Sequence, residues 1–237
     1  MALFSREGIY MELLSVKDRS VSELAEKLFI SEPTVRRDIL LLKEKDVVRC
    51  RRGIVSLKTG LADRRIPLSI RDYEGTDQKR AIAIKAIKEV KDGDSVMLDA
   101  STTVACLVPH LAQLKNILVI TNGARTAVEL NSFGIKTLCT GGEIAQECYA
   151  YIGPDAEAML SKYNADVAFF SCRGLSDDGI ATDTSILENS IRRIMMKNSK
   201  KSFLLCDSNK IGKKYISTLC NKDEVDGVIS DVEIKHK

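Results

Sequence analysis

Apolar residues recur at helical spacing in three short segments at the start of the chain. We expect helices over residues 4–15, over residues 20–29 and from Ser31 onward. Ser20 or Ser22 would cap the second helix and Ser31 the third, because serine hydroxyls accept hydrogen bonds from the free N–H groups of a first turn. The inward stripes are Ile9, Leu13 and Leu14; Leu24, Ala25 and Leu28; and Val35, Ile39 and Leu42. The short break before Ser31 predicts a helix-turn-helix.

The third helix carries cations where a helix disfavours them. Arg37 points away from the apolar stripe, and Arg36 and Thr34 flank it. Positive charge at a helix N-terminus is mildly unfavourable. In a DNA major groove, however, arginine binds guanine edges and phosphates supply the counter-charge. The alternative is a solvated face in which the arginines pair with Glu32 or Asp38.

A basic hairpin follows this helix. Residues 47–57, VVRCRRGIVSL, form two β-prone runs around Arg51, Arg52 and Gly53, as in the wing of a winged helix-turn-helix. Residues 1–58 hold 12 of the 36 lysines and arginines and 9 of the 33 aspartates and glutamates, so they account for the whole net charge of +3. This asymmetry favours a nucleic-acid-binding head on a neutral body. The predicted DNA-binding residues are Ser31, Thr34, Arg36, Arg37, Arg51 and Arg52.

The rest of the chain divides into a linker and a body. Residues 1–57 form the predicted DNA-binding domain, residues 58–76 lack clear periodicity and are interpreted as a linker, and residues 77–237 form the body. Predicted strands in the body alternate with helices, which argues for a parallel α/β sheet covered on both faces. The strands are expected at 95–99, 116–121, 135–140, 166–172, 201–207 and 227–231, and the helices at 78–90, 102–114, 124–133, 155–163 and 186–199.

Four strand–loop–helix junctions of the body are rich in small polar residues. Ligands of such folds bind beyond the carboxyl ends of the strands. Hydroxyls, glycines and free N–H groups suit a phosphate there, a lysine adds charge, and Asp99 and Asn122 suit sugar hydroxyls. Taken singly, each loop is equally explained as a helix cap or a turn. The candidate effector-binding residues are Asp99, Ser101, Thr102, Thr103, Thr121, Asn122, Gly123, Gly141, Gly142, Asp207 and Lys210.

Composition excludes several other classes. A hydrophobic fraction of 44% and a charged fraction of 29% are those of an ordinary globular protein, and no apolar run is long enough to span a bilayer. The N-terminus lacks a signal-peptide pattern. The seven cysteines include no C-x-x-C pair, which argues against a disulfide framework or a zinc site and for free thiols in a reducing cytosol. We therefore expect a cytoplasmic protein without metal or cofactor.

The order of these motifs resembles that of DeoR-family transcriptional regulators over nearly the full length. The head carries the signature as REGIYMELLSVKDRSVSELAEKLFISEPTVRRDILLLKEKDVVRCRRG, and the body carries landmarks such as VMLDASTT, VITNG, CTGGE and LLCDSNKIGKKY. The resemblance implies a winged helix-turn-helix joined to an α/β sugar-phosphate sensor domain that resembles ribose-phosphate isomerase. It also implies an operator, a phosphorylated sugar effector and repression of sugar catabolic genes. We expect a homo-oligomer, dimer or tetramer, because such a head needs paired half-sites.

Two departures from the family pattern leave alternatives open. Ser101 stands where the family has glycine, which would narrow the pocket or change the ester that fits. The wing keeps only Gly53 of the usual glycine pair. One alternative is therefore a constitutive DNA-binding protein with a non-functional pocket. The other is a sugar-phosphate isomerase-like enzyme, for which a general base would have to come from carboxylates such as Asp99, Asp183, Glu188 or Asp207.

Overall fold

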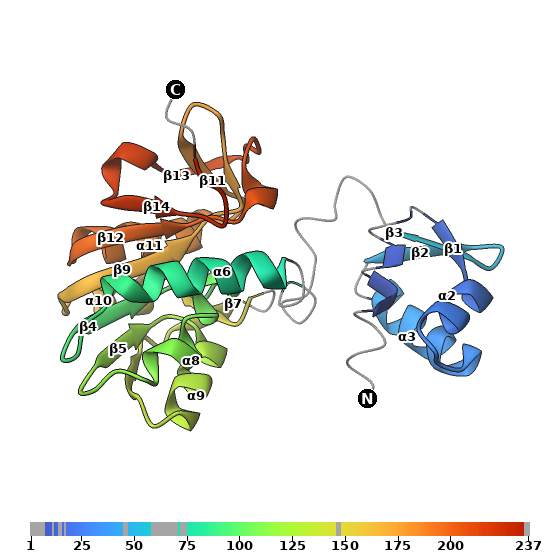
Figure 1. Cartoon of the computed structure of the whole chain (residues 1–237), viewed down its shortest axis with the longest axis horizontal. Coiled ribbons are helices and arrows are strands. Elements are labelled where there is room, and N and C mark those ends of the chain that lie inside the picture. The colour runs from blue at the N-terminus through green and yellow to red at the C-terminus, as the bar shows by residue number, and fades with distance from the viewer. Residues whose placement is uncertain are drawn as a thin grey trace. The chain divides into compact units, whose positions relative to one another are not determined.

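The chain folds into two units, each with its own apolar core (Figure 1). The computed structural model describes residues 8–10, 12–13, 16, 18–44, 47–57, 71, 75–145 and 148–234. The units are Met1–Glu74 and Gly75–Lys237. Most of the expected linker, residues 58–70 and 72–74, lies outside the described residues. Within the described part of the chain, no helix is long and apolar enough to cross a membrane.

The described residues of the head include helices α2 and α3 and a small antiparallel sheet. Helices α2 and α3 span Val21–Lys27 and Glu32–Glu44. The sheet has the order β1-β3-β2, with β1 at Asp18–Ser20, β2 at Val48–Arg51 and β3 at Ile54–Leu57. Of the expected first helix, residues 8–10 and 12–13 are described, and they are helical. Leu14 lies outside the described residues.

The predicted inward stripes of the head form its core. Ile9, Leu13, Leu24, Val35, Ile39 and Leu42 are all buried in one cluster. Ser20 is the N-cap of α2, because its hydroxyl accepts from the N–H of Glu23 while the Glu23 carboxylate accepts from the N–H of Ser20. The backbone bond to Ser20 comes first among the causes that lower the pKa of Glu23. Strand β1 was not expected, because three residues carry no readable alternation.

The body is built on a six-stranded parallel sheet of order β14-β12-β9-β4-β5-β6. From the centre, the chain builds outward through β4, β5 and β6 to one edge, and then through β9, β12 and β14 to the other. The direction reverses between β4 and β9, so this pair of strands is the switch point where such sheets bind ligands. The strands are β4 at Ser95–Leu98, β5 at Leu118–Thr121, β6 at Lys136–Cys139, β9 at Ala165–Ser171, β12 at Ser199–Leu205 and β14 at Gly227–Ile229.

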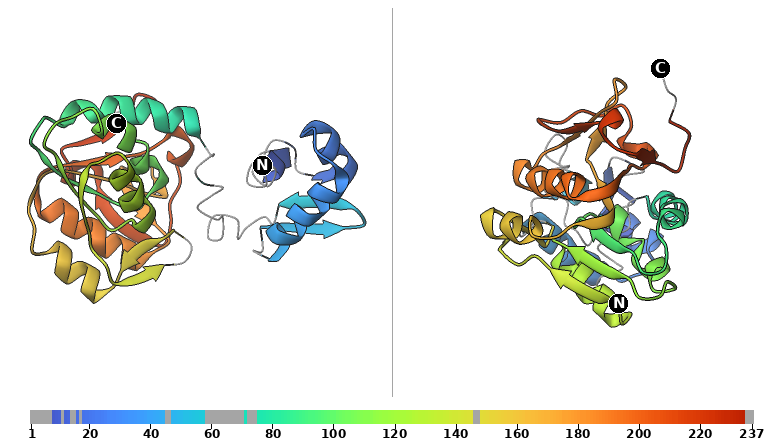
Figure 2. Two further views of the ribbon diagram at one scale, coloured as in Figure 1. Left: turned by 90° about the horizontal axis from the view of Figure 1, so that it is seen from below. Right: turned by 90° about the vertical axis from the view of Figure 1, so that its left-hand side faces the viewer.

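Helices cover both faces of this sheet (Figure 2). On one face α6 (Thr76–Ala86), α7 (Thr102–Ala105), α8 (Val108–Leu111) and α9 (Ala124–Ser132) pack in the larger core, with η1 at Ile87–Glu89. On the other face lie α10 (Pro154–Leu160) and α11 (Ile186–Lys197). Side chains alternate between the two faces: Val96 and Leu98 of β4 enter the first core and Met97 enters the second.

Some local expectations for the body were wrong. The single helix expected over 102–114 is two short helices, because Pro109 lacks an N–H and its ring crowds the preceding turn. Two antiparallel additions were not predicted, since their strands are short and mixed in polarity. They are the pair β7 (Glu143–Ala145) and β8 (Ala150–Ile152), and the sheet β10-β11-β13 (Gly174–Leu175, Ile180–Asp183, Ser217–Asn221). The turns η2 and η3 span Ser208–Lys210 and Lys222–Glu224.

Candidate functional site

Helix α3 presents its two arginines to solvent. The side chains of Arg36 and Arg37 are 64% and 62% exposed. Arg36 Nη2 donates to Glu32 Oε2 at 3.0 Å, and Arg37 Nε lies 3.8 Å from Asp38 Oδ1. Arg36 therefore makes an ion pair with Glu32, as the solvated-face alternative expects, whereas Arg37 makes only a long contact with Asp38. An exposed pair of this kind contributes little free energy, so Arg36 can exchange the carboxylate for a phosphate.

Ser31 and Thr34 close the start of α3. The Thr34 N–H lies 3.4 Å from Ser31 Oγ, and the two hydroxyl oxygens are 2.9 Å apart. This arrangement caps α3 as the sequence predicted. Both residues therefore hold the end of the helix that carries Arg36 and Arg37.

The tip of the wing is a two-residue turn made by Arg52 and Gly53. Arg51 pairs with Ile54, and the residues between them have φ of 51° and 79°. Two positive φ values mark a type I′ turn, in which the first position normally holds Asn, Asp or Gly. Arg52 occupies that strained position, and its side chain is exposed beside that of Arg51. The missing second glycine of the wing is thus replaced by a cation at the tip.

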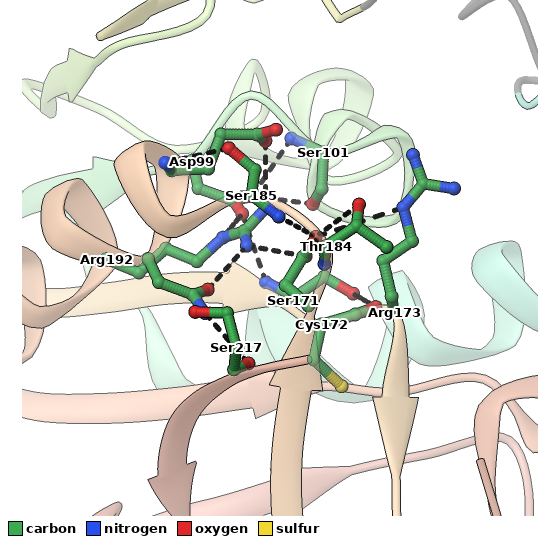
Figure 3. A network of polar contacts seen from close by, with 12 residues as sticks. Asp99, Ser101, Ser171, Cys172, Arg173, Thr184, Ser185, Arg192 and Ser217 are labelled. Carbon is green, nitrogen blue, oxygen red and sulfur yellow. Dashed lines mark hydrogen bonds and ion pairs between the residues drawn. The ribbon is translucent and has the colours of Figure 1, made fainter. Parts of the chain in front are cut away.

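In the body, Asp99 occupies the switch point between β4 and β9. Its Oδ1 accepts from the N–H and hydroxyl of Ser101, at 3.0 and 2.6 Å. Its Oδ2 accepts from the N–H of Ser171, at 3.2 Å, and from Nε of Arg192, at 2.8 Å. Four donors fill the lone pairs of the carboxylate. Asp99 therefore fixes the loop after β4 to the end of β9, and the Ser101 side chain turns back toward it (Figure 3).

Arg192 of α11 joins three carboxylates beneath this loop. Besides Asp99, it donates to Asp183 Oδ2 at 2.7 Å and to Glu188 Oε2 at 3.1 Å. Burial lowers the pKa of Arg192, but the charges of Asp183, Asp99 and Glu188 outweigh it and raise the pKa. Burial raises the pKa of Asp183, and the charges of Arg192 and Arg173 reverse this and lower it. The lowered pKa of Asp183 and the raised pKa of Arg192 keep these two groups ionised at neutral pH.

Lys210 reaches the same edge from the other side of β9. Its Nζ lies 3.1 Å from Asp207 Oδ2, 3.1 Å from Thr103 Oγ1 and 3.0 Å from Ser171 Oγ. Burial has the largest single influence and lowers the pKa of Lys210, but Asp207, Cys172 and Cys206 together outweigh it and raise the pKa, so the group remains an ammonium. The side chain is 22% exposed. Part of this cationic side chain is therefore accessible to solvent.

The loops after β5 and β6 hold the remaining candidates. Thr121 Oγ1 accepts from the N–H of Gly123 at 3.0 Å, and Asn122 Nδ2 donates to the Tyr151 carbonyl at 3.0 Å. Gly142 has a φ of 104°, and a Cβ there would lie 3.1 Å from the Ile152 carbonyl oxygen, so glycine is required. Gly141 also has positive φ, and Thr102 begins α7.

Both units match known family models. Residues 6–59 match the DeoR-like helix-turn-helix domain, and residues 74–232 match the DeoR C terminal sensor domain. The chain belongs to the DeoR family. It is a DNA-binding transcriptional regulator with a sensor domain, and the predicted winged helix-turn-helix followed by an α/β sensor is confirmed.

Relatives of this DeoR-family regulator match over nearly their whole length. An uncharacterised HTH-type transcriptional regulator of Bacillus subtilis is 31% identical over 98% of this chain and 90% of its own. The L-fucose operon activator of Haemophilus influenzae is 32% identical, covering 90% and 85%. A lactose phosphotransferase system repressor of Staphylococcus epidermidis is 29% identical, covering 89% and 84%.

Similarity to solved structures is found at low sequence identity. The Pyrococcus horikoshii translation initiation factor eIF-2B has a TM-score of 0.51 at 14% identity, covering 97% of this chain and 88% of its own. A ribose 5-phosphate isomerase from Methanocaldococcus jannaschii has a TM-score of 0.44 at 18% identity, covering 58% and 55%.

The sequence missed central residues of this DeoR-family site. Arg192 and Ser171 were not nominated, although both contact Asp99. A signal existed for Arg192, because Glu188 lies one turn before it on the predicted helix. Ser171 gave none, since it ends an apolar strand. Among the described residues, no group of three or more His, Cys, Asp or Glu side chains is arranged to hold a metal ion.

Proposed function

We propose that this DeoR-family regulator represses sugar catabolic genes and that a phosphorylated sugar, bound at the carboxyl edge of the six-stranded sheet, controls its affinity for an operator. The effector residues proposed are those nominated from the sequence, with Asp99 and Ser101 holding the loop and Lys210 meeting the phosphate. The relatives named as a lactose system repressor and a fucose operon activator support a role in sugar metabolism.

The position of the Lys210 ammonium is the observation that most strongly supports an effector site. It stands at the switch point, partly exposed, with the hydroxyls of Thr103 and Ser171 beside it. A phosphate needs positive charge and hydrogen-bond donors at close range, and the ammonium supplies the charge. The Thr103 and Ser171 hydroxyls accept from Nζ, and Ser171 donates its own proton to the Leu205 carbonyl at 2.6 Å, so both hydroxyls hold the ammonium in place. The pair with Asp207 keeps the ammonium oriented when no anion is present.

For DNA, we propose that Arg37 and Arg36 enter the major groove from α3 and that Arg51 and Arg52 contact phosphates or the minor groove from the wing. The exposure of α3's arginines supports this assignment. A single head covers few base pairs, so we expect a homo-oligomer on paired half-sites. Sedimentation of the full chain at micromolar concentration tests this, and a monomer both free and on DNA would contradict it.

The enzyme alternative is weakened by the state of its candidate bases. Asp99, Asp183 and Glu188 each contact Arg192, and Asp207 contacts Lys210. A general base must reach a substrate proton, and these carboxylates are committed to cations. We therefore propose a regulator without catalysis. Incubating the protein with each bound sugar phosphate and following the sugar by NMR tests this, and turnover would contradict it.

The non-functional-pocket alternative rested on Ser101. The Ser101 hydroxyl donates to Asp99 and accepts from the Val104 N–H at 3.3 Å, so it caps α7. A side chain held in this way leaves the loop able to take a ligand. We accordingly favour a working sensor in a cytoplasmic regulator.

One experiment addresses the whole proposal. An operator is selected from a random duplex pool, and its affinity for the full chain is measured by fluorescence anisotropy with and without a panel of sugar phosphates. A thermal-shift screen of the same panel reports binding, because a ligand specific for the native state raises stability. We expect at least one ester both to bind and to change operator affinity. Binding to the operator that no ester alters would contradict the sensor function.

A further inference from the structure

Two side-chain oxygens at the same carboxyl edge of the sheet as the proposed phosphate contact are buried without a hydrogen-bond partner. They are Oδ1 of Asn122 and Oγ1 of Thr140, and neither has a partner among the described residues. The two residues are 2% and 7% exposed. An unpaired buried polar atom is costly and uncommon in native proteins, so two such atoms together indicate that something else satisfies them.

The sheet places these two residues side by side. Thr121 of β5 pairs with Cys139 of β6, and the Thr140 N–H donates to the Thr121 carbonyl at 3.1 Å, which extends the ladder one step. Asn122 and Thr140 are thus neighbours on adjacent parallel strands. Neighbouring strands lie about 4.8 Å apart, which is the reach of two hydroxyls on one small molecule.

Asp99 lies at the same level of the sheet, one strand further on. Leu98 pairs with Thr121, so Asp99, Asn122 and Thr140 follow in a row over the ends of β4, β5 and β6. The Asp99 carboxylate has its four donors, whereas the other two residues each lack a partner. Ligand contacts are therefore open at Asn122 and Thr140 and closed at Asp99.

The orientation of the Asn122 amide is determined by its surroundings. Its Nδ2 donates to the Tyr151 carbonyl at 3.0 Å, so the oxygen is the free atom and can only accept. The Thr140 hydroxyl can donate or accept. Such a pair suits an alcohol that donates to Asn122 and exchanges a hydrogen bond with Thr140, and it does not suit an anion. The oxygens are covered, so a ligand reaches them only after a neighbouring segment moves.

We propose that Asn122 and Thr140 form a hydroxyl-binding subsite that selects polyhydroxylated esters over simple phosphate. This inference rests on the proposed function, in which Lys210 binds the phosphate end of the same molecule. Thr140 is then a specificity-determining residue, and Asn122 acts through its oxygen rather than its amide nitrogen.

The first test needs no ligand. Thr140→Val keeps the shape of the side chain and removes the unpaired hydroxyl, so the melting temperature should rise by about 2–4 °C. Thr182→Val is the matched control, because its buried hydroxyl donates to the Gly174 carbonyl and accepts from the Tyr215 N–H. That variant should melt at a lower temperature than the parent. A fall for Thr140→Val like that of the control would overturn the inference.

The second test uses stated probes with the full chain. Ribose 5-phosphate, glucose 6-phosphate, their 2-deoxy analogues and inorganic phosphate are titrated calorimetrically into the parent, Thr140→Val and Thr140→Ser. We expect a hydroxylated ester to bind the parent at least tenfold more tightly than inorganic phosphate. Thr140→Val should lose most of this preference with phosphate affinity unchanged, and Thr140→Ser should keep it.

The outcomes separate the two proposals. If esters bind the parent and Thr140→Val alike, the subsite is refuted while the sensor function stands. If the parent binds phosphate and no ester more tightly, the subsite is likewise refuted and the Lys210 contact stands. If the parent binds neither phosphate nor any ester, the effector proposal fails and the subsite fails with it.

Discussion

The head and the body expose their charges in opposite ways. In the head, Arg36 and Arg37 are mostly exposed and make one close ion pair and one long contact. In the body, Arg192 is 4% exposed and binds three carboxylates. A surface that meets a polyanion needs mobile, accessible cations. A site that recognises a small molecule needs fixed loops, and the buried network supplies them at the cost of tolerance to mutation.

The largest effect should therefore come from the body. Arg192→Met leaves Asp99, Asp183 and Glu188 without their shared cation, and breaking a buried ion pair costs about 3–5 kcal/mol of the free energy of unfolding. Arg36→Met in the head makes the same substitution at an exposed pair and should change it by less than about 0.5 kcal/mol. Urea denaturation of both full-length variants checks the difference. Equal effects would erase the distinction between the two regions.

The pH dependence of this loss has a definite sign. The folded-state pKa of Asp183 is lowered, so the stabilisation from its ionised form is complete above the unfolded value of about 4 and disappears as pH falls through the folded value. The parent should lose its advantage over Arg192→Met in acid. A difference between the two proteins that persists unchanged well below pH 4 would contradict the ionised network.

The next effect concerns DNA. Arg37→Ala should weaken binding to the selected operator by about 1–3 kcal/mol if the guanidinium binds a guanine edge. It should leave the free energy of unfolding nearly unchanged, because the side chain is exposed. Arg51→Ala, if it meets phosphate, should weaken all sequences alike and flatten the salt dependence. If Arg37→Ala and Arg51→Ala both bind DNA like the parent, α3 is not the recognition helix.

An effect of similar size is expected on the response of operator affinity to the sugar phosphate. Lys210→Ala should abolish most of the effect of the sugar phosphate on operator affinity, a coupling of about 1–3 kcal/mol, while affinity without ligand stays near that of the parent. Thr103→Ala should act in the same direction but less, since it removes a hydrogen bond and no charge. Lys214→Ala is the charge control, because Lys214 is exposed and lies 3.6 Å from Asp178. Circular dichroism must show all three folded, and an unchanged response in Lys210→Ala would place the pocket elsewhere.

The same contrast explains what the sequence could predict. The core of the head follows from local periodicity, since Val35, Ile39 and Leu42 share one helical face, and the strands of the body follow from short apolar runs. The contacts that make the site are non-local: Arg192 meets Asp99 across 93 positions. No spacing announces such a partner, so the sequence nominated Asp99 as a sugar ligand and offered no reason to see its carboxylate fully occupied.

The sequence predicted which residue types lie in the loops of the site, but it could not predict which way their side chains point. The sequence identified Ser101 as a departure, yet which way its hydroxyl turns depends on the Asp99 carboxylate and the start of α7. Thr140 was not nominated because it ends the strand expected at 135–140 and precedes two glycines. Its missing hydrogen bond is visible only once the neighbouring strands are in place.

The smallest predicted effect lies in the turn of the helix-turn-helix. Phe29 has a φ of 53° and is 95% exposed, so an L-residue bears backbone strain there while its ring is barely buried. Phe29→Gly should relieve that strain and stabilise the head by about 0.5–1 kcal/mol. Phe29→Ala removes the ring and keeps the strained backbone, so it should give no such gain.

Hydrogen exchange of amides in α2 and α3 measures this local stability without interference from the body. Exchange should slow a few-fold in Phe29→Gly and stay near the parent rate in Phe29→Ala. If both variants were destabilised, the ring would be shown to contribute packing that its exposure does not indicate. If both instead weakened operator binding with stability unchanged, Phe29 would join the exposed arginines as a side chain kept for DNA. The head would then contain a strained residue retained for contact, as the body contains buried charges retained for positioning.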